Sequence, residues 1–166
     1  MHTNAPALSR KENIVSISAP IGVLVVDDHD SLRSSIVRTL NSETDIIVVG
    51  EGRNGIEAIE QVSVLAPDVV VMDIVMPSMD GLAAIEKIRN INGSSKVLII
   101  SNYDEEPYVR SCMKEGASGY ILKDALTSDL AAAIRVVHKG GHFFTQQIAQ
   151  RIVGLYLQQV TSIEQR

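Results

Sequence analysis

Residues 69–82 read VVVMDIVMPSMDGL, and this stretch decides the fold. Its first four residues are apolar and mostly β-branched, which suits a strand that is covered on both faces, as in a parallel sheet. Asp73 follows the strand directly, and a loop with Pro77 leads to Gly81, where a segment of helical period begins. A buried strand, a polar residue at its carboxyl end and a helix together predict one βα unit.

Similar units precede and follow this stretch along the chain. Because right-handed crossovers leave few arrangements for a five-fold βα alternation, we expect an α/β fold with a doubly wound, five-stranded parallel sheet of flavodoxin-like order 2-1-3-4-5 and an extra C-terminal helix. The predicted strands are 21–26, 46–50, 68–72, 96–100 and 119–122, and the predicted helices are 31–42, 55–65, 81–91, 105–115 and 127–138.

The two ends of the chain differ from this repeating part. Residues 1–19 lack the continuous apolar core of a secretory signal and predict a mobile N-terminal tail, followed by one domain over residues 20–141. Residues 142–166 predict an amphipathic linker helix, because apolar residues recur there at helical spacing. This helix could pack on the domain or serve as a linker or self-association helix; its apolar positions are Ile148, Ile152, Leu155, Tyr156 and Val160.

Composition excludes several classes of function. The 166-residue chain has a formal charge of −5 and a pI near 5.3, so it lacks the broad basic field that would bind nucleic acid. Cys112 is the only cysteine, which forbids an intrachain disulfide and favours a reducing, cytoplasmic location. The apolar runs fall far short of the ~20 residues that span a bilayer, so no membrane segment is expected.

Polar residues follow four of the predicted strands where each strand ends. Asp27 and Asp28 follow the first strand, Asp73 the third, Ser101 the fourth and Lys123 the fifth. Any one of them could be an ordinary turn residue, since turns favour Asp and Ser. Turn chemistry does not explain three carboxylates, a hydroxyl and an ammonium at one edge of a sheet, so we expect a functional site there.

Three neighbouring carboxylates repel one another unless a cation lies between them. Mg²⁺ fits best, because it takes oxygen ligands and is usually held by one or two carboxylates with waters and phosphate oxygens. We therefore expect Asp27 and Asp28 to hold the metal and Asp73 to be the nucleophile that forms an acyl phosphate. Lys123 would pair with a phosphoryl oxygen, and the Ser101 hydroxyl would donate to another.

Four stretches resemble bacterial response-regulator receiver domains: VLVVDDH (23–29), VVVMDIVMPSMDGL (69–82), VLIISNY (97–103) and GASGYILKD (116–124). Together with GGHFF at 140–144, they resemble the subfamily whose receivers precede a LuxR/NarL-type helix-turn-helix domain. The resemblance implies a two-component phosphoacceptor that takes a phosphoryl group from a histidine kinase onto Asp73. It also implies a Mg²⁺ ion held by Asp27, Asp28, Asp73 and the Val75 backbone carbonyl.

The same resemblance implies how the domain would signal. Ser101 and Tyr120 would be the switch residues, and they would reshape the surface of the fourth helix, fifth strand and fifth helix. DNA would be reached through a C-terminal domain absent from this chain. A homodimer is a further expectation, with contacts on the C-terminal helix and around Tyr108, Val109 and Cys112. The sequence pattern alone favours the other interpretation, in which Tyr120 is a fixed, half-buried strand residue.

Three other functions fit less well. An aspartyl phosphatase or phosphotransferase needs a second Asp two residues after the nucleophile on the first strand, which the pair Asp27-Asp28 does not provide. A flavin module needs a phosphate loop after that strand, where these carboxylates would repel the phosphate. A receiver-like protein-interaction domain that is never phosphorylated remains the main alternative, although the complete residue set argues against it.

Overall fold

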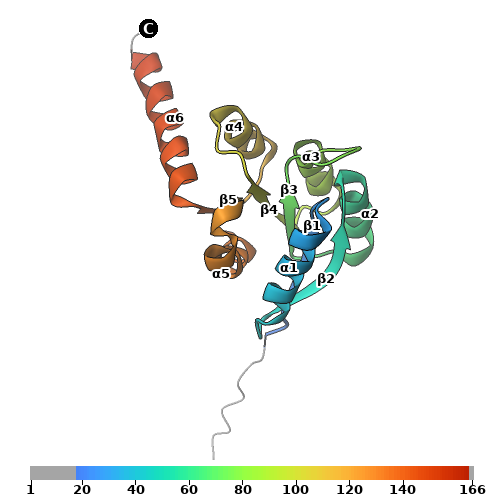
Figure 1. Ribbon diagram of the computed structural model, residues 1–166. Helices are drawn as coiled ribbons and strands as arrows, with labels where there is room; N and C mark the ends of the chain where they lie inside the picture. The colour runs from blue at the N-terminus through green and yellow to red at the C-terminus, as the bar shows by residue number, and fades with distance from the viewer. Residues whose placement is uncertain (1–17, 165–166) are drawn as a thin grey trace, which may run out of the picture.

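In the computed structural model, which describes residues 18–164, six parallel strands form one sheet of order β2-β1-β3-β4-β5-β6 (Figure 1). The first five strands have the predicted order, and helices lie on both faces of the sheet. The strands are β1 (Ile21–Val26), β2 (Ile46–Gly52), β3 (Val69–Asp73), β4 (Lys96–Ser101), β5 (Gly119–Leu122) and β6 (Phe143–Phe144).

The helices divide between two apolar cores. One core lies where α1 and α5 pack on the sheet, and the other lies beneath α2, α3 and α4, where the start of α6 joins it through the fully buried Ile148. The central strands β1 and β3 are buried along their whole length, as strands covered on both faces must be. The helices are α1 (Asp30–Asn41), α2 (Gly55–Leu65), α3 (Gly81–Ile91), α4 (Glu106–Glu115), α5 (Leu126–His138) and α6 (Gln146–Glu164).

The sixth strand was not predicted. β6 contains only two residues, too few to show a period, and it forms because the chain after α5 returns alongside β5, with Phe143 opposite Gly119 and Phe144 opposite Tyr120. A short 3₁₀ turn, Lys123–Ala125, also links β5 to α5. The predicted N-terminal tail, residues 1–19, lies almost wholly outside the described residues. Within residues 18–164, no helix is long and apolar enough to cross a membrane.

The prediction for the surface of α4 was wrong in part. Val109 and Cys112, expected among the dimer contacts, are fully buried in the core, and only Tyr108 of that group is exposed. Its ring stacks on that of Tyr103, with the centroids 5.1 Å apart. An amphipathic pattern in a sequence does not say which apolar residues face the core, and here the tertiary packing places these two inside.

The N-terminus of α3 approaches the end of β3 very closely. The Gly81 amide donates to the Ile74 carbonyl at 2.7 Å, and a Cβ atom on Gly81 would lie 2.1 Å from the Asp73 carbonyl oxygen. Only glycine permits this approach. The loop after Asp73 is therefore held by backbone contacts that no other residue type at position 81 would allow.

Candidate functional site

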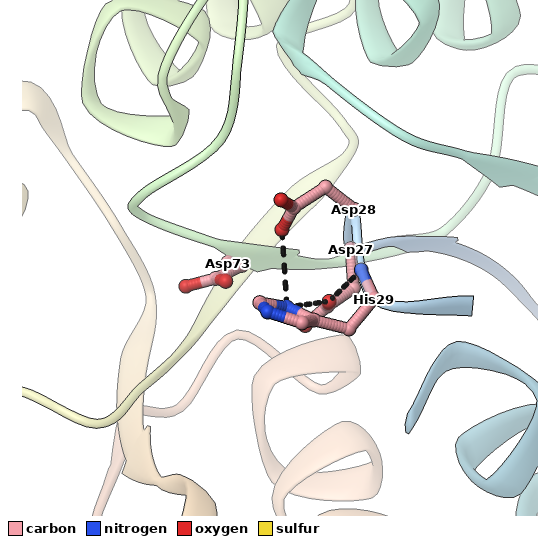
Figure 2. A group of neighbouring side chains, drawn as sticks. All are labelled: Asp27, Asp28, His29 and Asp73. Atoms are coloured by element: carbon pink, nitrogen blue, oxygen red, sulfur yellow. Dashed lines mark hydrogen bonds and ion pairs between the residues drawn. The ribbon is translucent and has the colours of Figure 1, made fainter. Parts of the chain in front are cut away.

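The five predicted site residues gather at the carboxyl edge of the sheet. Asp27 and Asp28 follow β1, Asp73 ends β3, Ser101 ends β4, and Lys123 follows β5. Because β1 and β3 are adjacent parallel strands, their ends bring these carboxylates together, and Figure 2 shows Asp73 lying beside the Asp27-Asp28-His29 turn.

Lys123 bridges two buried carboxylates. Its Nζ lies 2.9 Å from Asp27 Oδ2 and 2.9 Å from Asp73 Oδ2. The three side chains are at least nine-tenths buried. One ammonium thus links β1, β3 and β5 across 96 and 50 residues of sequence. Removing it would leave two carboxylates buried without a counter-charge.

Burial raises the pKa of Asp73 above its ordinary value, and the nearby Asp27 carboxylate adds to this effect. The hydrogen bond from Lys123 acts in the opposite direction without outweighing burial. Burial alone would lower the pKa of Lys123, yet its bonds to Asp73 and Asp27 raise that pKa above the ordinary 10.5. The pKa values of both groups can be raised together, because one ammonium pairs with two carboxylates and neither carboxylate has a cation to itself. The site therefore carries an excess of negative charge.

Asp28 and His29 complete a cluster with Asp27 and Asp73. One ligand atom from each of the four residues lies within 4.8 Å of the others. Asp28 Oδ1 is buried and accepts no hydrogen bond from residues 18–164, although His29 Nδ1 lies 3.2 Å from it without hydrogen-bond geometry. The carboxylate arrangement is consistent with a metal site, because oxygen atoms with excess negative charge, one lacking a donor, suit a hard divalent cation.

His29 was not among the predicted site residues. It is exposed, and its backbone amide donates to Asp27 Oδ1 at 2.8 Å, which tightens the turn after β1 and brings the imidazole back over the carboxylates (Figure 2). Its position directly after Asp27-Asp28 was the available signal, because a turn at a strand end places the next side chain near the same edge. Arg33 of α1 was also missed, and its Nη1 donates to the Asp27 carbonyl at 2.7 Å.

Val75 approaches Asp73 through its backbone amide, which lies 3.4 Å from Asp73 Oδ1. This is a long hydrogen bond, so Oδ1 is less firmly held than Oδ2, which accepts from Lys123. The Val75 side chain is half exposed. The metal-binding role predicted for the Val75 carbonyl remains a prediction.

Ser101 and Tyr120 contact the same short loop after β4. Ser101 is buried, and its Oγ accepts from the Tyr103 amide at 3.0 Å. Tyr120 is also fully buried, and its hydroxyl donates to the Tyr103 carbonyl at 2.6 Å. Burial raises the pKa of Tyr120, so its hydroxyl remains a proton donor at neutral pH. A movement of this loop would therefore change the hydrogen bonds of both residues.

The same loop reaches the C-terminal helix. Asp104 accepts hydrogen bonds from Gln147 and from Arg151 of α6, the second at 3.1 Å. The hydrogen bond from Arg151 lowers the pKa of Asp104 most, and the bond from Gln147 lowers it further. A groove of about 230 Å³ beside the site has Ser101, Lys123 and Gln147 in its lining. The start of α6 thus lies at the rim of the candidate site.

Comparison with known proteins gives one consistent result. The family model described as "Response regulator receiver domain" matches residues 23–135. The response regulator protein VraR of Staphylococcus saprophyticus is 39% identical over 129 residues, which cover 78% of this chain and 62% of VraR. The nitrate/nitrite response regulator protein NarL of Escherichia coli is 36% identical over 126 residues, which cover 76% of this chain and 58% of NarL.

A solved structure gives the same picture. The two-component response regulator of the LuxR family from Aurantimonas sp. SI85-9A1 has a TM-score of 0.79 and 28% sequence identity, and the match covers 84% of this chain and 99% of that one. The chain spans about three fifths of the length of the curated relatives VraR and NarL.

Proposed function

The chain belongs to the response regulator receiver domain family, whose members are signalling phosphoacceptors rather than enzymes in the ordinary sense, and on this premise we propose that it accepts a phosphoryl group on Asp73 from a partner histidine kinase. The observation that carries the proposal is the geometry at Asp73. Its carboxylate is buried, bound by Lys123 at 2.9 Å and flanked by the carboxylates of Asp27 and Asp28.

The transfer requires one bond to form and one to break. A carboxylate oxygen of Asp73 forms a bond to phosphorus, and the bond from phosphorus to the donor's imidazole nitrogen breaks, with its electron pair staying on that nitrogen. The less firmly held oxygen, Oδ1, is suited to attack, because Lys123 holds Oδ2. Lys123 also lies where it can pair with a phosphoryl oxygen as negative charge arrives at the site.

The residues present fit Mg²⁺. Asp27, Asp28, Asp73 and the Val75 carbonyl would hold the ion, and they offer only oxygen atoms. When bound, Mg²⁺ supplies positive charge that offsets the carboxylates and the phosphoryl oxygens. Asp28 is the side chain best placed to respond to it, because its Oδ1 accepts no hydrogen bond from the described residues.

Signalling would proceed from the loop after β4. The Ser101 hydroxyl would turn toward the acyl phosphate, its bond from the Tyr103 amide would break, and the Tyr120 hydroxyl would follow the Tyr103 carbonyl. A new set of acceptors at Asp73 would in this way favour one of two loop conformers. The affected surface is that of α4, β5 and α5.

In our proposal, the segments that pass the signal on from the receiver domain follow residue 141. Residues 20–141 form the receiver domain, residues 142–166 a linker helix, and the signal passes to transcription through a C-terminal DNA-binding domain. The names of the relatives as response regulators, and the fraction of their length that this chain spans, support this proposal. A homodimer and a cytoplasmic location are further inferences from family membership.

Phosphorylation by a small donor tests the proposal. The chain is incubated with Mg²⁺ and acetyl phosphate, and its intact mass is measured for the native chain, for Asp73→Ala and for Asp45→Asn. The native chain and Asp45→Asn should gain one phosphoryl group, because Asp45 lies before β2 at the opposite edge of the sheet, and Asp73→Ala should gain none. The added mass should be lost with hydroxylamine, which cleaves acyl phosphates.

Two results would contradict the proposal. A native chain that gains no phosphoryl group at any Mg²⁺ concentration would favour the alternative, a receiver-like interaction domain. An adduct that persists in Asp73→Ala would place the acceptor elsewhere.

A further inference from the structure

We propose that Arg33 is a positioning residue for the metal site: it fixes the peptide between Asp27 and Asp28, and thereby aims the Asp28 carboxylate at the cluster. This inference rests on the proposed function. Arg33 belongs to α1, and its side chain donates to the Asp27 carbonyl, Asp30 and Glu51, and not to Asp73, among the described residues.

Arg33 is a buried charge with all its nitrogen atoms engaged. The side chain is 8% exposed. Its Nη1 donates to the Asp27 carbonyl at 2.7 Å, its Nη2 to Asp30 Oδ1 at 2.6 Å, and its Nε to Glu51 Oε2 at 3.0 Å. The planar fork of a guanidinium suits this set of three acceptors, because its donors lie on three separate nitrogen atoms, whereas the donors of an ammonium all lie on one.

The three contacts differ in what surrounds them. The carboxylates of Asp30 and Glu51 are 71% and 46% exposed, so water would solvate either one if the arginine were absent. The bond to the Asp27 carbonyl is buried. The contact that depends most on Arg33 is therefore the one directed at the candidate site.

Arg33 also completes the set of contacts around Asp27. The Asp27 amide donates to the Gly52 carbonyl at 3.0 Å, its Oδ1 accepts from the His29 amide and its Oδ2 accepts from Lys123. With Arg33 on its carbonyl, each polar group of this fully buried residue has a partner.

Asp28 has no comparable support of its own. Its Oδ1 accepts no hydrogen bond from the described residues. The exposed His29 imidazole approaches this oxygen at 3.2 Å but without hydrogen-bond geometry, so the direction of the Asp28 carboxylate depends mainly on the backbone that carries it. The Asp27 carbonyl and the Asp28 amide belong to one planar peptide unit. A donor that fixes this carbonyl therefore fixes the plane from which the Asp28 side chain departs. Residues that orient metal ligands in this way typically change metal affinity by about 10- to 100-fold when replaced.

The test measures metal binding directly as well as phosphorylation. Mn²⁺ binding is followed by electron paramagnetic resonance, and the Mg²⁺ concentration for half-maximal phosphorylation by acetyl phosphate is measured, for the native chain, Arg33→Met and Arg33→Lys. Ser95→Ala is the matched control, because Ser95 directly precedes β4, at the edge of the sheet opposite the site, and its buried hydroxyl donates to the Pro67 carbonyl. Folding of each variant is checked by circular dichroism.

We expect Arg33→Met to weaken Mn²⁺ binding about tenfold and to raise the half-maximal Mg²⁺ concentration by a similar factor. At saturating Mg²⁺ the maximal rate should return to within about twofold of the native value, because excess metal compensates for a misdirected ligand. Arg33→Lys should lie between the two. Ser95→Ala should lose stability without changing either metal constant.

An unchanged Mn²⁺ constant in a folded Arg33→Met would overturn the inference, and so would an equal change in Ser95→Ala. If Arg33→Met does not fold, Arg33→Lys decides, and native metal affinity in that variant refutes the positioning role. The Mn²⁺ measurement needs no phosphorylation. A native chain that binds Mn²⁺ but gains no phosphoryl group would therefore count against the proposed function alone.

Discussion

Replacement of Lys123 by Met should destabilise the fold strongly in the absence of divalent metal. Lys123 lies 2.9 Å from both Asp27 Oδ2 and Asp73 Oδ2, and at an effective dielectric constant of about 20 each pair has a gross attraction of about 6 kcal/mol. Much of this attraction is offset by the cost of removing three charges from water. Breaking a buried pair by removing one partner typically costs a net 3–5 kcal/mol, so we expect a loss of about 3 kcal/mol at pH 7.

Urea unfolding followed by circular dichroism measures this loss, with and without Mg²⁺. A ligand at ten times its Kd stabilises the native state by about 1.4 kcal/mol. Mg²⁺ should stabilise Lys123→Met more than the native chain, because it would replace the missing positive charge between the carboxylates. In the double variant Lys123→Met/Asp73→Asn the loss should be smaller than in Lys123→Met alone, since only Asp27 then lacks its partner.

Arg110→Met is the control, since Arg110 forms a 2.6 Å pair with Glu106 on the exposed surface of α4. Such pairs contribute only about 0.3–0.5 kcal/mol. The picture of two buried carboxylates sharing one ammonium is refuted if Lys123→Met loses no more free energy of unfolding than Arg110→Met. It is also refuted if Mg²⁺ stabilises Lys123→Met and the native chain equally.

Two further predictions follow from the same site. Because the pKa of Asp73 is raised in the folded state, its contribution to stability is present below the ordinary value of 3.8 and is lost as the pH rises through the raised pKa. Without Mg²⁺, Asp73→Asn should therefore be more stable than the native chain at pH 7. Urea titrations should show the difference in free energy of unfolding between the two chains narrowing toward acid pH. A gap that widens toward acid pH would contradict the sign. Gly81→Ala should lower the free energy of unfolding by about 1–3 kcal/mol, since its Cβ would lie 2.1 Å from the Asp73 carbonyl oxygen. Gly93→Ala, whose Cβ meets only the Arg89 carbonyl at 3.6 Å among the described residues, should cost far less when both variants are unfolded in urea.

Local sequence patterns were sufficient for most of the architecture. The apolar runs and helical periods predicted five strands and their order, because strands buried on both faces contrast clearly with amphipathic helices. The two-residue β6 escaped this reasoning, since it exists only by pairing with β5. The C-terminal helix was predicted, and whether it packs on the domain or projects from it was left open. In the structure its start packs on the domain, because Ile148 is buried in the core, whereas Val153 and Tyr156 farther along are exposed.

The sequence pattern could not say which apolar residues of α4 lie on the surface. Val109 and Cys112 belong to an apolar stripe that could have been exposed or buried, and only packing against α3 and the sheet placed them inside. Arg33 is the converse case. It lies three residues before Ile36 and seven before Leu40, on the stripe that α1 buries, and a charge in such a stripe was a readable sign of a buried role.

By itself, the sequence determined which residues would meet at the candidate site. Parallel strands bring their carboxyl ends to one edge, so Asp27, Asp73 and Lys123 had to approach one another once the strands were recognised. Only the tertiary structure decided how they meet, with one ammonium shared between two carboxylates and no hydrogen-bond donor to Asp28 Oδ1 in the part of the chain that the structure describes. These relations join residues up to 96 positions apart. Distances of a few ångströms across such separations depend on the packing of the whole sheet and its helices, which no local pattern records.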